Sequence, residues 1–195
     1  MAYSDQQRQE LLLTARLAVG AAARGRSQEP PAPPDPALAE LRGAFVTLKQ
    51  AGRLRGCIGY LDPRFPLYQT VARAAAAAAI GDPRFPPVAP DELDSLSVEI
   101  SVLTPLQPVD RVEDIRVGCH GLVVRQGGRS GLLLPQVPLE WGWDREQFLA
   151  HTCLKAGLPE DAWQNGAELL CFEAEVFEEE QEESEIPQAA PPPEE

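Results

Sequence analysis

The stretch 43–60 constrains the fold most, because it joins two alternating segments through a tight turn. Residues 44–49 (AFVTLK) alternate with a period of two, which is typical of a β-strand that buries one face. Residues 51–53 (AGR) form a predicted turn, and 54–60 (LRGCIGY) return as the second strand of a hairpin. The chain therefore contains antiparallel sheet.

Helices are predicted on either side of this hairpin. Residues 4–23 place their apolar side chains on one helical face, and Ser4 with Gln7 forms a plausible capping box. The alanine-rich segment 67–80 lies between two copies of the sequence Asp-Pro-Arg-Phe-Pro, at 62–66 and 82–86. Each copy is interpreted as a turn in which proline stops or starts regular structure.

The remaining pattern predicts more strands and one further helix. Residues 97–104 alternate as a strand, 121–126 and 132–134 flank a glycine-rich turn, and 169–177 form a last strand. Asp144 caps a helix that continues to Ala156. Several hairpins with separate helices indicate an α+β fold, with an antiparallel sheet flanked by helices.

Two segments are expected to lie outside the packed core. Residues 24–36 contain five prolines and predict an extended, unpacked connector. Residues 178–195 hold eight acidic side chains and no basic one, which predicts a disordered tail. The whole chain carries a net charge of −13, and residues 1–177 account for −5 of it.

Charge and cysteine usage narrow the classes of function. The chain has two lysines and no basic run, so binding to a nucleic-acid backbone is disfavoured. The polar first ten residues predict no secretory signal, and the longest apolar run is too short for a membrane helix. Four separate cysteines are then expected to be reduced thiols of a cytoplasmic protein. No metal site is predicted, because the Cys/His pair 119–120 is adjacent in sequence and adjacent residues seldom bind one ion together, and no cofactor fingerprint is present.

The densest candidate site is the strand segment 54–59 (LRGCIG). Arg55 and Cys57 are two residues apart, so their side chains leave a strand on the same face, and a guanidinium beside a thiol favours the reactive thiolate. Gly56 and Gly59 could let a ligand approach the backbone. The alternative is a structural thiol, with Arg55 paired to a carboxylate.

His120 is the second candidate, since it lies in a glycine-flanked loop before a strand. A histidine that projects into a cleft suits proton transfer, and His120 could act as the base for Cys57. Both residues would then open onto a common hollow. A surface or capping histidine is the alternative.

Further features are weaker candidates. Glu99 and Lys49 are polar residues on otherwise apolar strands, and each either reaches the same cleft or faces water. The glycine-rich segment 127–131 resembles a phosphate-binding turn but lacks the P-loop lysine, so a hairpin turn is favoured. Gln136 follows it as a candidate ligand-binding residue, and Trp141 is expected to anchor a core.

The chain resembles the AMMECR domain family, whose prokaryotic members are called AmmeMemoRadiSam system protein A. The resemblance runs from about residue 5 to residue 177 and is carried by seven collinear stretches. They are 43–48 (GAFVTL), 54–59 (LRGCIG), 82–87 (DPRFPP), 98–103 (VEISVL), 120–122 (HGL), 131–137 (GLLLPQV) and 143–144 (WD).

The resemblance implies one AMMECR domain over 1–177, with two unequal subdomains of which the smaller is β-rich. It also implies partners, a Memo-like protein and a radical S-adenosylmethionine (radical SAM) protein, but no reaction. Two hypotheses follow. In the first, the chain is a cleft-bearing subunit with Cys57 as nucleophile or redox thiol, His120 as acid/base and Arg55 as clamp for a small anionic or carbonyl substrate. In the second, it is a non-catalytic binding or adaptor module for the same partners.

Overall fold

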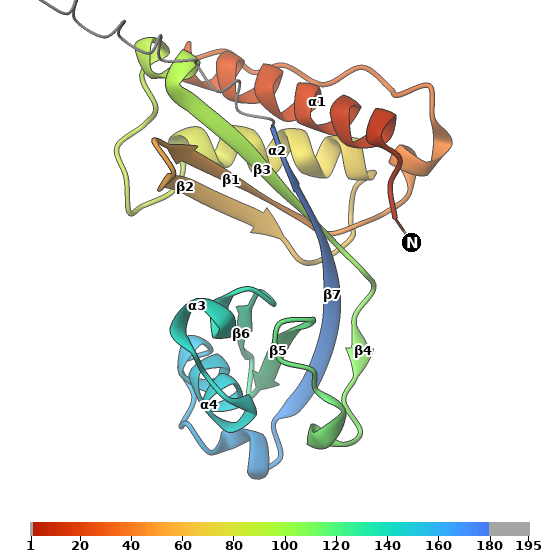
Figure 1. The fold of residues 1–195 in the computed structure, drawn as a ribbon, viewed down its shortest axis with the longest axis vertical. Helices are drawn as coiled ribbons and strands as arrows, with labels where there is room; N and C mark the ends of the chain where they lie inside the picture. Colours follow the sequence, from red (N-terminus) through yellow and green to blue (C-terminus); the bar gives the residue numbers. More distant parts are fainter. Residues whose placement is uncertain (1, 180–195) are drawn as a thin grey trace, which may run out of the picture.

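The structure is a computed structural model that describes residues 2–179. Two helices form one of its layers. Helix α1 (Asp5–Ala23) begins at the predicted capping box, in which the Ser4 hydroxyl accepts from the Gln7 N–H and the Gln7 side chain accepts from the Ser4 N–H. Helix α2 (Leu67–Ile80) packs against α1, and both helices cover the same face of the sheet (Figure 1).

The second layer is a curled antiparallel sheet, as the sequence predicts. Its strands follow the order β2-β1-β3-β7-β5-β6, and a short strand β4 also pairs with β7. The strands are β1 (Ala44–Gln50), β2 (Arg53–Tyr60), β3 (Leu96–Leu103), β4 (Gln107–Pro108), β5 (His120–Gln126), β6 (Arg129–Leu133) and β7 (Glu168–Glu178).

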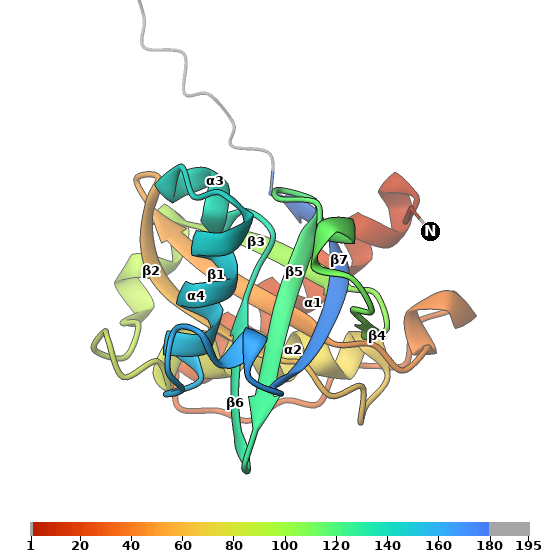
Figure 2. The same ribbon diagram turned by 90° about the horizontal axis from the view of Figure 1, so that it is seen from below.

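Strand β7 connects two halves of the molecule. The larger half contains α1, α2, β1, β2 and β3, and the smaller half contains β4, β5 and β6. Its C-terminal part pairs with β3, where Glu99 lies opposite Glu178, and its N-terminal part pairs with β5, where His120 lies opposite Glu173. Figures 1 and 2 show β7 running between the two halves. The smaller half adds helix α3 (Val137–Trp141) and helix α4 (Arg145–Lys155), and Asp144 caps α4 as predicted.

The alternation seen in the sequence decides which sheet face is covered. Ala44, Val46 and Leu48 of β1 are fully buried on the face that carries α1 and α2. Their neighbours Thr47 and Lys49 leave the strand on the opposite face and are only partly buried. This opposite face of β1, β2 and β3 is called the open face below.

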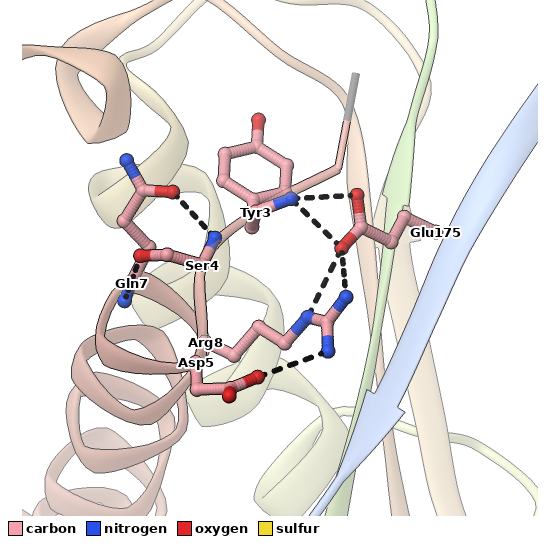
Figure 3. Close-up of polar contacts among 6 residues, drawn as sticks. All are labelled: Tyr3, Ser4, Asp5, Gln7, Arg8 and Glu175. Carbon is pink, nitrogen blue, oxygen red and sulfur yellow. Dashed lines mark hydrogen bonds and ion pairs between the residues drawn. The ribbon is translucent and has the colours of Figure 1, made fainter.

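The N-terminus of α1 is tied to the last strand of the sheet by Glu175 of β7 (Figure 3). The Glu175 carboxylate accepts from the Tyr3 backbone N–H at 3.0 Å and from Arg8 Nε at 3.1 Å. Arg8 also pairs with Asp5 in the first turn of the helix. The contact joins residues 172 positions apart and so fixes α1 against the last strand.

The proline-rich connector is extended but is not unpacked, contrary to the prediction. Pro30 and Pro33 are half-buried, and the connector ends in a 3-10 helix (Pro36–Ala39) whose Leu38 is fully buried. Asp35 caps this turn and accepts a hydrogen bond from Gln7 of α1. These contacts hold the connector against the helices.

Glu178 and Glu179, which the sequence assigns to the tail, are held by contacts with the rest of the protein. Glu178 is the last residue of β7, and Glu179 donates its backbone N–H to Val98. The Glu179 carboxylate also forms an ion pair with Arg16 of α1 and accepts from the Val98 N–H at 2.9 Å. The rest of the predicted tail, 180–195, lies outside the described residues. Within 2–179, no helix has the length and apolarity that crossing a membrane requires.

Candidate functional site

Polar side chains form a continuous row across the open face of the sheet. The strand register aligns Cys57 of β2 with Thr47 of β1, Glu99 of β3 and Glu178 of β7. The Thr47 hydroxyl lies 3.3 Å from the Cys57 sulfur. Lys49 Nζ bridges the other end of the row, at 2.7 Å from Glu99 and 3.0 Å from Glu178. The four aligned residues and Lys49 are called the polar row below.

The charges of the polar row stabilise one another. Burial alone would lower the pKa of Lys49, but its hydrogen bonds with Glu99 and Glu178 outweigh that effect and hold the pKa above its ordinary value. Glu99 is the better shielded carboxylate, since 16% of its side chain is exposed against 57% for Glu178. The row therefore presents a charged ammonium beside a carboxylate at neutral pH.

The Cys57 thiol is half-buried, and its surroundings favour the protonated form. Burial raises the pKa of Cys57 above its ordinary value, although the Thr47 hydrogen bond and the charge of Arg84 act in the opposite direction. The thiol is thus protonated at neutral pH. The guanidinium that acts on it belongs to Arg84, whereas the sequence pattern had indicated Arg55.

The second Asp-Pro-Arg-Phe-Pro copy seals the outer edge of β2. The Asp82 carboxylate accepts from the Cys57 backbone N–H at 2.9 Å and from Arg84 Nη2 at 2.7 Å. Arg84 Nη2 lies 3.4 Å from the Cys57 carbonyl oxygen. The hydrogen bond from Arg84, with the backbone contacts, holds the pKa of the buried Asp82 carboxyl well below its usual range. Sequence reasoning missed both residues, although the repeat of the motif was visible.

Arg55 is committed to internal contacts. Its guanidinium pairs with Glu92 at 2.9 Å and donates to the carbonyl oxygens of Pro86 and Pro87. Only 11% of its side chain is exposed. This is the carboxylate pairing that the sequence left open as the structural alternative, so the contacts give the predicted anion clamp no support.

The two glycines of β2 make room for neighbouring protein atoms. A Cβ on Gly56 would overlap the carbonyl oxygen of Ala78 in α2, and a Cβ on Gly59 would overlap the ring of Phe45. Their missing side chains allow the sheet to approach α2 on one face and Phe45 to lie across the strand on the other. Close packing therefore accounts for the glycines without a ligand.

His120 lies at the start of β5, and its partners belong to the smaller half. The Arg116 backbone N–H donates to Nδ1 at 3.3 Å, and Arg116 Nη2 lies 3.2 Å from Nε2. Arg116 in turn pairs with Glu173 at 2.7 Å. Burial, followed by the charge of Arg116, lowers the pKa of His120, so the ring is neutral at pH 7.

Gln136 precedes α3 and carries an unsatisfied acceptor. Its Oε1 is buried and has no hydrogen-bond partner among residues 2–179. A buried acceptor without a partner costs about 1–3 kcal/mol relative to a satisfied one. Among the predicted site residues, Gln136 would therefore gain the most free energy from a ligand that donates a hydrogen bond to it.

The structure joins some of the predicted residues and separates others. Thr47 and Lys49 connect Cys57 with Glu99 in one row, whereas no hydrogen bond within 2–179 joins Cys57 to His120, and the two residues share no partner. The surface hollows found along α1 contain neither residue. The common hollow and the catalytic roles stay predictions. Within the same residues, no three His, Cys, Asp or Glu side chains are grouped as metal ligands would be.

Fold and site together define an α+β domain with a curled antiparallel sheet, two helices on one face and a polar row on the other. The family model AMMECR1 matches residues 12–177 of the chain. The chain therefore belongs to the AMMECR1 family.

Relatives of the chain include proteins of Thermococcus gammatolerans and Methanopyrus kandleri. A protein of Thermococcus gammatolerans is 53% identical over 167 residues, which cover 80% of this chain and 82% of the relative. Protein MK0488 of Methanopyrus kandleri is 52% identical over 164 residues, or 79% of each chain. The crystal structure of uncharacterized protein PH0010 from Pyrococcus horikoshii has a TM-score of 0.82 at 48% identity and covers 87% of this chain and 90% of its own.

Proposed function

We propose that this chain binds a small polar substrate at the polar row and acts as a subunit beside a Memo-like and a radical SAM protein. The observation that carries the proposal is the half-buried Lys49–Glu99 pair, which Thr47 separates from Cys57 in the same row. Removing charges from water costs free energy that an apolar pair of similar volume would not require. A sheet built only for stability would therefore favour apolar residues at these positions.

The chemistry of the row favours binding over nucleophilic attack. Cys57, protonated because its pKa is raised, can donate or accept a weak hydrogen bond. Glu99 can accept and Lys49 can donate, so a ligand with both polar functions would satisfy the row. The supply or processing of that ligand by the two partners follows from the family resemblance.

Enrichment of small molecules by the purified protein tests this proposal. Equilibrium dialysis against a small-molecule cell extract, read by mass spectrometry, would compare the wild-type protein with Glu99→Gln and Thr47→Val. Glu113→Gln is the matched control, because Glu113 is 62% exposed and lies outside the row. We expect at least one compound to be enriched by the wild-type protein and by the control, but by neither variant of the polar row. Equal enrichment by all four proteins, or none by any, contradicts the proposal.

A non-catalytic adaptor is the second candidate, and the surface of α3 favours it. Leu139 and Trp141 are 62% and 70% exposed. The prediction that Trp141 anchors a core is therefore wrong. Trp141 instead stacks on Trp143 with ring centroids 6.0 Å apart. Exposed neighbouring apolar side chains of this size are typical of protein contacts.

Calorimetric titration with the Memo-like and radical SAM proteins tests the adaptor. Trp141→Ala should weaken complex formation by about tenfold or more if this surface docks a partner. Leu41→Ala is the control, since Leu41 is 58% exposed on the larger half. Absence of a complex with either protein at micromolar concentration argues against the adaptor, and an unchanged affinity of Trp141→Ala excludes this surface.

A further inference from the structure

A groove runs between α1 and α2 beneath the proline-rich connector, away from the polar row. Two hollows, of about 190 and 370 Å³, share the lining residues Ala18, Gln28, Pro30 and Ala72, so they are adjacent to each other. On α1 the lining extends from Glu10 to Ala22, about 18 Å at 1.5 Å per residue. This feature is called the connector groove below.

One end of the connector groove is mainly apolar, with Glu10 as the one charged residue of its lining. Leu13 and Leu17 of α1 line it together with Tyr68 of α2 and the prolines of 30–34. Leu13 and Leu17 are 60% and 49% exposed, so the connector leaves much of their surface in contact with water. Covering such surface removes apolar area from water, which favours an apolar occupant at this end.

The other end carries positive charge. Arg26 of the connector and Arg73 of α2 line the larger hollow, with Glu29 as the one carboxylate beside them. The Arg73 guanidinium lies 4.2 Å from the centre of the ring of Phe65, a residue that lines neither hollow. Within residues 2–179, neither arginine forms an ion pair. A local excess of positive charge is unusual in a chain of net charge −13.

We propose that the connector groove binds a monomeric amphipathic anion, such as a medium-chain carboxylate. The apolar tail would lie between Leu13, Leu17 and the connector prolines, and the anionic head would pair with Arg26 and Arg73. Guanidinium groups recognise carboxylates and phosphates through paired N–H donors, and the apolar end offers no such partner. The polarity of the groove thus fixes the direction of the ligand. The site is separate from the polar row and independent of its proposed function.

Binding of decanoate below its micelle concentration, measured by isothermal titration calorimetry, tests this inference. Decanol, which has the same tail without the charge, should bind about three- to tenfold more weakly, the range expected for one or two partly exposed ion pairs. The double variant Arg26→Gln/Arg73→Gln should lose the same factor for decanoate and none for decanol. Arg24→Gln is the matched control, because Arg24 is exposed nearby but does not line the connector groove.

A second variant separates the tail site from the head site. Leu13→Gln should weaken both ligands, and because Leu13 is largely exposed the variant should keep the melting temperature of the wild type. Failure of decanoate to bind overturns the inference, as does binding that is indifferent to both arginines. Binding to vesicles of phosphatidylglycerol without binding to decanoate also overturns it, because the surface would then recognise a membrane.

Discussion

The carboxylate of Asp82 accepts a hydrogen bond from the backbone N–H of Cys57, 25 residues earlier, at 2.9 Å. Cys57 lies on β2, which is an edge strand of the sheet. An uncovered edge exposes unpaired backbone groups that can pair with another chain. The loop that begins at Asp82 therefore takes the place of a neighbouring strand at the residue whose side chain begins the polar row.

Replacing Asp82 by asparagine should destabilise the protein. The change removes the charge from a carboxylate whose side chain is 2% exposed and which binds the Cys57 N–H and Arg84. Hydrogen bonds to a charged group contribute about 1.5–3 kcal/mol, so we expect a loss of that order in the free energy of unfolding at pH 7. Asp62→Asn is the matched control, since Asp62 holds the same motif position but is 57% exposed and should cost less than about 0.5 kcal/mol. Urea denaturation measures both, and equal losses would contradict the interpretation.

The same pair predicts an acid dependence. The pKa of Asp82 lies below its value in the unfolded chain, so its contribution is complete above about pH 4 and is lost as the pH falls further. The difference in unfolding free energy between wild type and Asp82→Asn should therefore be constant from pH 7 to pH 5 and should shrink below pH 4. A difference that changes most between pH 5 and pH 7 would assign the effect to another group.

Alkylation should distinguish Cys57 from an exposed thiol. Burial raises the pKa of Cys57, and the thiolate is the species that reacts, whereas Cys119 is exposed. At pH 7.5 we expect iodoacetamide to modify Cys57 about tenfold or more slowly than Cys119, as read by peptide mass spectrometry. Thr47→Val should slow Cys57 further, because it removes a hydrogen bond that lowers the pKa. Preferential modification of Cys57 would contradict this expectation and support the prediction that Cys57 acts as a nucleophile.

Glycine substitutions should show that β2 is packed too closely for a side chain. Gly56→Ala would place a methyl group against the backbone of Ala78 and should cost about 1–3 kcal/mol or more. Gly20→Ala offers the contrast, since Gly20 lies inside α1 and its nearest foreign atom, 3.1 Å away, is the flexible tip of Arg24. That variant should stabilise the protein by about 0.5–1 kcal/mol. Thermal unfolding of both variants measures the two signs, and a harmless Gly56→Ala would contradict this packing.

His120 should titrate below the usual range of histidine. Burial and the charge of Arg116 lower its pKa in the folded protein. The folded state then binds fewer protons than the unfolded chain, so this contribution to stability is present above about pH 6.5 and declines below it. NMR titration of the ring should give a midpoint below that of a model histidine, and Arg116→Gln should shift the midpoint upward. A downward shift of the midpoint in Arg116→Gln would contradict the assignment of this effect to the charge of Arg116.

The regular elements could be predicted because their causes are local. The alternation in 44–49, the capping box at Ser4 and the cap at Asp144 each depend on residues within a few positions of one another. Their bounds in the structure agree with the predicted ones to within a few residues. The packing of the connector and of residues 178–179 could not be predicted, because it depends on partners far along the chain. Pro30 and Pro33 lie against helices, and Glu179 pairs with Arg16.

The candidate site was only partly predictable for the same reason. The period of two correctly predicts which face of its own strand Cys57 or Thr47 occupies. The register between the two strands decides that these side chains meet. The pattern Arg-Gly-Cys could not show that Arg55 turns to Glu92, because that contact crosses 37 residues. It also could not show that Asp82 and Arg84 fold back onto the edge of β2.

The sequence by itself determined the family, the α+β class, the positions of helices and strands and the residue types available for chemistry. Tertiary structure alone decided which of those residues meet. It placed Cys57 and Glu99 in one row, left His120 with Arg116 and Glu173, and set the sign of the pKa shift of Cys57. The physical reason is that hydrogen bonding along the chain acts over a few residues, whereas burial and charge act through space.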